Sequence, residues 1–269
     1  MQDLKVTLVQ TYLEWENPQA NFRLFEEKLA PLKNQTDLII LPEMFTTGFT
    51  MNAANVFDDN GTKTKLFLQK HASEINAAIC GSVIVKENNH FFNRLYFVLP
   101  DGTVFHYDKR HLFRMAKEHK VFSGGEERLI VKYKGWRICP LICYDLRFPV
   151  WSRNHDYIHN TSKDLVYDLL IYVANWPSPR KTAWKDLLKA RAHENLAYVC
   201  GVNCIGKDGN NVEYSGNSAI INFKGEILLQ REDGKSFTET ISLNYEDLTK
   251  FREKFPAFLD KDYFYIIDK

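Results

Sequence analysis

The sequence lacks an excess of either charge. It has 35 Lys and Arg against 34 Asp and Glu, which leaves a formal net charge of +1. Proteins that bind nucleic acid usually carry a basic face, and this sequence has no cluster of basic and aromatic residues that predicts one. We therefore expect no nucleic-acid partner.

Long apolar runs are also missing. The apolar stretch 165–176 is interrupted by Asp168 and is too short to cross a bilayer. The chain starts Met1-Gln2-Asp3 and runs directly into a strand-like alternation, without a charged and then apolar signal segment. We therefore expect a cytoplasmic protein with no membrane partner.

Cysteine is scarce, and its spacing does not indicate a metal site. There are five cysteines, an odd number that favours reduced thiols over a disulfide framework. The pairs Cys139/Cys143 and Cys200/Cys204 lack the CxxC spacing of structural zinc sites, and no histidine cluster accompanies them. We expect no metal, and we expect Cys200, Cys204, His106 and His193 to pack structurally.

Strand and helix patterns mix along the whole length, with no linker or repeat between them. We predict strands at 6–13, 37–41, 79–85, 91–99, 103–107, 128–133, 136–142, 168–173, 198–202, 218–222 and 226–231, and helices at 17–33, 62–73, 184–195 and 244–251. Hairpins that alternate with strand–helix–strand units predict an α/β protein with mixed sheets. We expect two sheets packed face to face with helices outside, in one domain over residues 1–269.

Three reactive side chains directly follow predicted strands. Glu43 comes after strand 37–41, Lys109 after strand 103–107, and Cys143 after strand 136–142. Groups just past the carboxyl ends of strands meet at the ligand crevice of an open α/β sheet. We therefore expect a carboxylate, an ammonium and a thiol to lie together. Each also has a simpler interpretation on its own. Glu43 could be a turn residue in water, Lys109 a member of a charged run, and Cys143 a small core residue.

Their chemistry is complementary. The thiolate is the reactive form of cysteine, and a neighbouring carboxylate such as Glu43 can take the thiol proton. When sulfur attacks an amide, Lys109 and the backbone N–H of Tyr144 can stabilise the oxyanion. Glu43 can then protonate the leaving ammonia and activate the water that hydrolyses the thioester. This scheme needs no cofactor.

Three local sequences carry a family resemblance. They are Leu-Pro-Glu-Met-Phe at 41–45, Tyr-Asp-Lys-Arg-His-Leu-Phe at 107–113 and Leu-Ile-Cys-Tyr-Asp-Leu-Arg-Phe-Pro at 141–149. In this order and spacing they resemble the nitrilase superfamily of carbon–nitrogen hydrolases, over the chain from the first strand to about Arg231. The resemblance implies a four-layer αββα sandwich, a catalytic Glu43–Lys109–Cys143 set and a homodimer formed by stacking. It also implies a second glutamate, for which Glu118 is the candidate, although a solvated charge is the alternative there.

Two further stretches, Pro-Glu-Met-Phe-Thr-Thr-Gly-Phe at 42–49 and Ala-Asn-Trp-Pro at 174–177, look most like the omega-amidase branch. That resemblance implies hydrolysis of the terminal amide of 2-oxo acids such as 2-oxoglutaramate and 2-oxosuccinamate. Such a substrate needs a cation, for which we predict Arg147, and a partly apolar slot walled by Phe49 and Trp176. An ion pair between Arg147 and Asp145, and core packing of Trp176, are the alternatives.

Other readings remain open at this stage. They are an N-carbamoyl amidase or nitrilase, a Cys–His hydrolase using His111 or His119, and a small-molecule binder without turnover. The polar segment 154–166, with His155, His159, Thr161 and Ser162, is longer than the family turn, and we expect it on the surface. The aromatic tail 244–269 is a candidate for the subunit contact.

Overall fold

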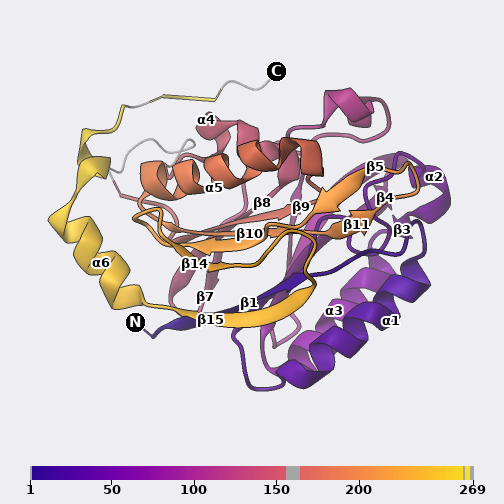
Figure 1. Ribbon diagram of the computed structural model, residues 1–269, viewed down its shortest axis with the longest axis horizontal. Coiled ribbons are helices and arrows are strands. Elements are labelled where there is room, and N and C mark those ends of the chain that lie inside the picture. The colour runs from indigo at the N-terminus through magenta and orange to yellow at the C-terminus, as the bar shows by residue number, and fades with distance from the viewer. Residues whose placement is uncertain (1, 156–163, 263, 267–269) are drawn as a thin grey trace.

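Two β-sheets lie face to face at the centre of the molecule (Figure 1). The computed structural model describes residues 2–155, 164–262 and 264–266. The first sheet has the order β15-β1-β2-β4-β5-β6, with β3 paired to β4, and the second has the order β14-β13-β10-β9-β8-β7. A separate two-stranded ribbon pairs β11 with β12.

The elements have the following bounds. The first sheet contains β1 (Leu4–Gln10), β2 (Leu38–Ile40), β3 (Asp58–Asp59), β4 (Ala78–Glu87), β5 (His90–Val98), β6 (Val104–Asp108) and β15 (Phe237–Leu243). The second contains β7 (Val131–Tyr133), β8 (Trp136–Ile142), β9 (Leu169–Ala174), β10 (Tyr198–Asn203), β13 (Ala219–Ile221) and β14 (Ile227–Gln230); the ribbon is β11 (Ile205–Lys207) and β12 (Glu213–Ser215). The α-helices are α1 (Pro18–Leu29), α2 (Ala53–Val56), α3 (Thr62–Ile75), α4 (Pro149–Ser152), α5 (Lys181–Asn195) and α6 (Tyr245–Lys254). Short 3₁₀ turns are η1 (Ala30–Leu32), η2 (Arg114–Ala116), η3 (Glu118–Lys120), η4 (Cys143–Arg147), η5 (Ser178–Arg180) and η6 (Ala257–Asp260).

Both sheets are mixed, as predicted. In the first sheet β2 runs parallel to β1 and β4, whereas β5, β6 and β15 join in antiparallel fashion. In the second sheet β8, β9 and β10 are parallel, and β13 and β14 extend it antiparallel. The parallel strands β2 and β8–β9 matter most here, because their carboxyl ends open onto the same region.

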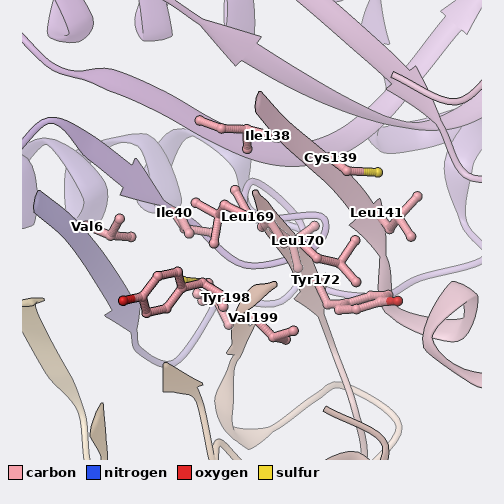
Figure 2. Packing of buried hydrophobic residues seen from close by; sticks show 14 of the residues in the cluster. Val6, Ile40, Ile138, Cys139, Leu141, Leu169, Leu170, Tyr172, Tyr198 and Val199 are labelled. Atoms are coloured by element: carbon pink, nitrogen blue, oxygen red, sulfur yellow. The ribbon is translucent and has the colours of Figure 1, made fainter. Parts of the chain in front are cut away.

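Helices cover the outer faces of both sheets (Figure 1). Along β2, Leu38 and Ile40 pack between the sheets, while Ile39 faces α1 and α3. Figure 2 shows the layer between the sheets, where Val6 and Ile40 share one cluster with residues of the second sheet such as Leu169. On the far side α5 packs against β10. The predicted αββα sandwich is therefore confirmed.

Turn and cap residues fix several element boundaries. The Asn17 side chain accepts a hydrogen bond from the Ala20 N–H at 3.1 Å and so starts α1 at Pro18. Asn88 and Asn89, with φ of 49° and 65°, make the predicted hairpin between β4 and β5. The helix predicted for 17–33 ends earlier, at Leu29, because Pro31 has no N–H to continue the α-helical pattern.

Several strand predictions need correction, because β3, β11, β12 and β15 were not predicted. Strand β15 was not predicted, because Thr238-Glu239-Thr240 reads as polar and its partner β1 lies far away in the sequence. The strand predicted for 128–133 covers only Val131–Tyr133. Arg128 instead donates hydrogen bonds to the carbonyls of Trp151 and Arg153.

The expected surface segment is partly buried. Asn154 and His155 are 2% and 0% exposed. Asn154 donates to the Tyr167 carbonyl at 2.8 Å and accepts from the Tyr167 N–H at 2.9 Å, so it closes the start of the segment onto β9. His159, Thr161 and Ser162 lie outside the described residues.

Of the cysteines and histidines that we expected to pack structurally, the cysteines are buried and the histidines are not. Cys200 and Cys204 are buried, as predicted, whereas His106 and His193 are exposed, contrary to prediction. Within the described parts of the chain, no helix has the length and apolar character to cross a membrane.

Candidate active site

The ends of strands from both sheets meet in one buried cluster. Glu43 follows β2, Lys109 follows β6, and Cys143 follows β8. The Lys109 ammonium lies 2.8 Å from Glu43 Oε1, and both side chains are fully buried. The structure thus places together the residues that the sequence placed only at separate strand ends.

The backbone at Cys143 is unusual. Cys143 has φ of 44°, a left-handed conformation that is uncommon for a non-glycine residue, at the start of the turn η4. Asp145 supports this turn by accepting hydrogen bonds from the Ile142 N–H at 3.0 Å and the Tyr107 hydroxyl at 2.8 Å. Its other oxygen lies 2.8 Å from His111 Nδ1. Asp145 therefore has its partners at the end of β8, on β6 and in the segment after β6, and it is not paired with Arg147.

The Glu43 carboxylate has a hydrogen-bond donor on each oxygen. Oε1 accepts from Lys109 and, at 2.8 Å, from Asn93 Nδ2. Oε2 accepts from the backbone N–H of Asn175 at 2.7 Å. Asn93 and Asn175 were not predicted as site residues: Asn93 is a neutral amide on β5, and the stretch 174–177 drew attention only through its resemblance and Trp176.

Glu118 belongs to the same cluster. It is fully buried, and its two oxygens lie 3.0 and 3.1 Å from Lys109 Nζ. The backbone N–H of Phe113 also donates to Glu118 Oε2. The alternative reading of Glu118 as a solvated charge is therefore wrong.

Burial and charge set the protonation states. Burial raises the pKa of the Glu118 carboxyl, against the opposing effect of Lys109. Burial also works against a charged Lys109, yet Glu118 and Glu43 outweigh it and raise the pKa of the ammonium. The pKa of the Cys143 thiol is raised well above its usual range by burial and by the adjacent Glu43 carboxylate. Both effects favour the protonated thiol.

A cavity of about 500 Å³ opens above this cluster. Cys143 and Lys109 line it, as do the four residues that the sequence assigned to substrate: Phe49, Tyr144, Arg147 and Trp176. Lining residues that the sequence did not predict include Trp15, Glu16, Arg180, Asp208 and Tyr214. The lining is largely apolar, which suits a small organic ligand held by a few polar contacts.

Arg147 is available to an anionic ligand. Its guanidinium carbon lies 5.1 Å from the centroid of the Trp176 ring, and its side chain is exposed. Among the residues that the structure describes, Arg147 has no carboxylate partner. Trp176 serves as cavity wall and is also 2% exposed, so its core-packing alternative holds alongside the predicted role.

Replacing Lys109 by Met tests the electrostatics of the cluster. Without the ammonium, the pKa of Glu118 rises further, and a buried carboxyl with a raised pKa lowers stability once the pH exceeds its unfolded value. We expect Lys109→Met to lose about 3–5 kcal/mol of unfolding free energy at pH 8 and clearly less at pH 5. Urea denaturation at both pH values measures this.

Two variants serve as comparisons. Lys120→Met removes an exposed lysine from the same region and should change stability by less than about 0.5 kcal/mol. Lys109→Met/Glu118→Gln removes one of the two carboxylates and should regain part of the loss at pH 8. An equal loss for Lys109→Met at pH 5 and pH 8 would contradict the charge argument.

The chain was compared with known proteins. The carbon-nitrogen hydrolase family model matches residues 5–252. The omega-amidase YafV of Yersinia enterocolitica is 47% identical over 99% of this chain and 100% of its own length. The 2-oxoglutaramate amidase of Bacillus subtilis is 33% identical over 95% of this chain and 96% of its own.

Solved structures agree. XC1258 from Xanthomonas campestris, described as a CN-hydrolase superfamily protein with an arsenic adduct in its active site, superposes with a TM-score of 0.95 at 44% identity. That match covers 99% of this chain and 100% of XC1258. Nit3 of Saccharomyces cerevisiae, at 22% identity and a TM-score of 0.81, covers 95% of both chains and shares the fold. The extent of the family match and the identity to full-length relatives show that this chain belongs to the carbon-nitrogen hydrolase family.

Proposed function

We propose that the protein is an omega-amidase, which hydrolyses the terminal carboxamide of a small 2-oxo acid to a carboxylate and ammonia. 2-Oxoglutaramate and 2-oxosuccinamate are the proposed substrates. The observation that carries the proposal is the buried cluster of Glu43, Lys109 and Cys143, of which Lys109 and Cys143 line the cavity. The names of the relatives from Yersinia enterocolitica and Bacillus subtilis support the substrate class.

The first half of the reaction forms a thioester. Cys143 Sγ attacks the amide carbon while Glu43 takes the thiol proton, which the raised pKa of the thiol makes necessary. Negative charge develops on the carbonyl oxygen, where the Lys109 ammonium and the Tyr144 N–H stabilise it. Glu43 then returns the proton to the nitrogen, and ammonia leaves.

The second half releases the acid. Glu43 accepts a proton from a water molecule as that water attacks the thioester carbon. When the carbon–sulfur bond breaks, Glu43 returns this proton to Cys143 Sγ, and the product acid loses its own proton to become the carboxylate. Glu118 acts through Lys109, because its two oxygens hold the ammonium in place and favour its charged form. A single ammonium thus faces the reacting centre in a fixed position.

Substrate recognition is assigned to the cavity wall. Arg147 binds the substrate carboxylate, because a guanidinium matches a carboxylate with two parallel hydrogen bonds. Phe49 and Trp176 bound the aliphatic part, and the Phe49 ring centroid lies 5.2 Å from Lys109 Nζ. A linear substrate held by Arg147 at one end then presents its amide to Cys143 at the other.

The alternatives make different predictions. An N-carbamoyl amidase would release carbon dioxide as well as ammonia, a nitrilase would act on a nitrile, and a binder would give no product. A Cys–His hydrolase gains no support from the geometry. His111 is stacked on Phe148 with centroids 3.8 Å apart, His119 is exposed, and the described residues that line the cavity include no histidine.

Ammonia release tests the proposed reaction. Wild type is offered 2-oxoglutaramate, glutamine, a nitrile and an N-carbamoyl amino acid, beside Cys143→Ala and Glu43→Gln. We expect release from the oxo-amide, none from Cys143→Ala, and a rate about 10²- to 10⁴-fold lower for Glu43→Gln because the base is lost. If wild type cleaves a different substrate through Cys143, the proposed substrate is wrong. Full activity of Cys143→Ala would refute the thioester mechanism.

Arg147→Met tests carboxylate recognition. A lost hydrogen bond to a charged group should raise KM for 2-oxoglutaramate about 10- to 100-fold and change kcat little, because the contact is equal in ground and transition states. Arg23→Met, which changes an exposed arginine of α1, is the control and should leave KM unchanged. An unchanged KM for Arg147→Met would show that another group, such as Arg180, binds the substrate carboxylate.

We also propose that the chain acts as one cytoplasmic domain and pairs as a homodimer through segment 244–269. The five cysteines are all free, which supports a reducing compartment. Helix α6 is anchored by buried Leu248, but Phe255 and Tyr265 beyond it are 55% and 70% exposed. Large exposed aromatics are typical of protein contacts.

The assembly is tested by mass in solution. Phe255→Glu/Tyr265→Glu should convert a wild-type dimer to a monomer, because it places charge in an apolar contact. Leu66→Glu, at a leucine of α3 that is 64% exposed, is the matched control and should remain a dimer. A monomeric wild type, or a dimeric double variant, would contradict the proposed contact. Light scattering after gel filtration distinguishes these outcomes.

A further inference from the structure

The two groups that exchange a proton in the proposed reaction belong to different sheets. Glu43 follows β2 of the first sheet, whereas Cys143 follows β8 of the second. Their separation therefore depends on how the ends of the two sheets are held together. A shift of about 1 Å in such a contact can lower a rate about 10²-fold.

Asn175 contacts both groups through its backbone. It directly follows β9 and is 5% exposed. Its N–H donates to Glu43 Oε2 at 2.7 Å, and its carbonyl oxygen lies 4.0 Å from Cys143 Sγ. The backbone of Asn175, which belongs to the second sheet, thus contacts both Glu43, at the end of a first-sheet strand, and Cys143, at the end of a second-sheet strand.

The side chain of Asn175 closes the gap between the sheets. Its Nδ2 donates to the backbone carbonyl of Glu43, and its Oδ1 accepts from Cys204 Sγ at 2.9 Å. A thiol hydrogen is a donor, so Cys204 fixes the amide with its oxygen toward sulfur and its NH₂ toward Glu43. Cys204, just past β10, is buried at 3% exposure and has no part in the thioester chemistry.

We propose that Asn175 is a positioning residue that holds Glu43 against Cys143, and that the Cys204 thiol keeps the Asn175 amide in the required orientation. The inference has two readouts, and the first of them, kcat for amide hydrolysis, rests on the proposed function. The other readout, alkylation of Cys143 by iodoacetamide, also needs transfer of the thiol proton but needs no amide substrate. The two readouts together separate a failure of positioning from a failure of the proposed function.

Substitutions at Asn175 test the first part. Asn175→Ala should lower kcat about 10²-fold with KM changed less than about threefold, and should slow Cys143 alkylation in parallel, because the base is misplaced. Asn175→Asp should be at least as slow, since a carboxylate cannot donate to the Glu43 carbonyl. Asn154→Ala is the matched control, because Asn154 is equally buried and hydrogen-bonded but remote from the cavity. It should lower Tm and leave kcat of the folded enzyme within about twofold.

Substitutions at Cys204 test the second part and remain informative if Asn175→Ala does not fold. Cys204→Ala removes the donor and should lower kcat and the alkylation rate about five- to tenfold. Cys204→Ser restores a donor and should return both rates to near the wild-type value. This rescue is not expected of a residue that only fills space.

The outcomes that overturn the inference are distinct. Asn175→Ala with a lowered Tm but wild-type kcat and alkylation rate would show that Asn175 is structural only. Equal rates for Cys204→Ser and Cys204→Ala would refute the role of the thiol hydrogen bond. If wild type releases no ammonia from any amide while alkylation still depends on Asn175, the proposed function fails and the positioning role stands.

Discussion

The contact of one buried ammonium with two buried carboxylates is the interaction on which the site depends. Lys109 lies within 3.0 Å of both Glu43 and Glu118, and none of the three side chains reaches solvent. Burial disfavours a charged Lys109, but its contacts with the two carboxylates outweigh that effect and raise the pKa of the ammonium. The contact therefore fixes the relative positions of the end of β2, the end of β6 and the turn η3, which carry Glu43, Lys109 and Glu118. The amides of Asn93 and Asn175 complete this arrangement by donating to the same Glu43 carboxylate.

The state of the nucleophile follows from that charge arrangement. Burial and, after it, the neighbouring Glu43 carboxylate raise the pKa of the Cys143 thiol, and Lys109 opposes them. A resting thiolate, as in a cysteine paired with an imidazolium, is not favoured here. In the proposed reaction, proton transfer to Glu43 accompanies the attack on the carbonyl instead. The short path from sulfur to carboxylate then becomes a geometric requirement, which explains why the ends of two different sheets need a direct hydrogen-bonded link.

Much of this could be predicted from the sequence, and the part that could not has physical reasons. A continuous apolar run identified β2, and the largely apolar stretch after the Lys134-Gly135 turn identified β8; their ends located Glu43 and Cys143. Glu118 sits in the polar run Lys-Glu-His, and its burial comes from a turn that tertiary packing folds inward. Asn93 and Asn175 belong to the site because they donate hydrogen bonds to the Glu43 carboxylate, and the local sequence does not predict these long-range contacts. Strand β15 depends on a partner at the opposite end of the chain, so its polar alternation alone does not distinguish it from a loop.

Charged groups of the cavity wall account for the orientation of the substrate in the proposed binding mode. Lys109 lines the cavity, and its ammonium is held by Glu43 and Glu118, two carboxylates that are not themselves among the lining residues. The wall carries Arg147 and Arg180, neither of which has a carboxylate partner among residues 2–155, 164–262 and 264–266. In the proposed binding mode, an amide acid lies with its carboxylate toward these arginines and its neutral amide toward Cys143. The position of the arginines then decides which end of the molecule reacts. The largely apolar lining of the cavity gives little discrimination of chain length, so specificity has to come from these few charged groups.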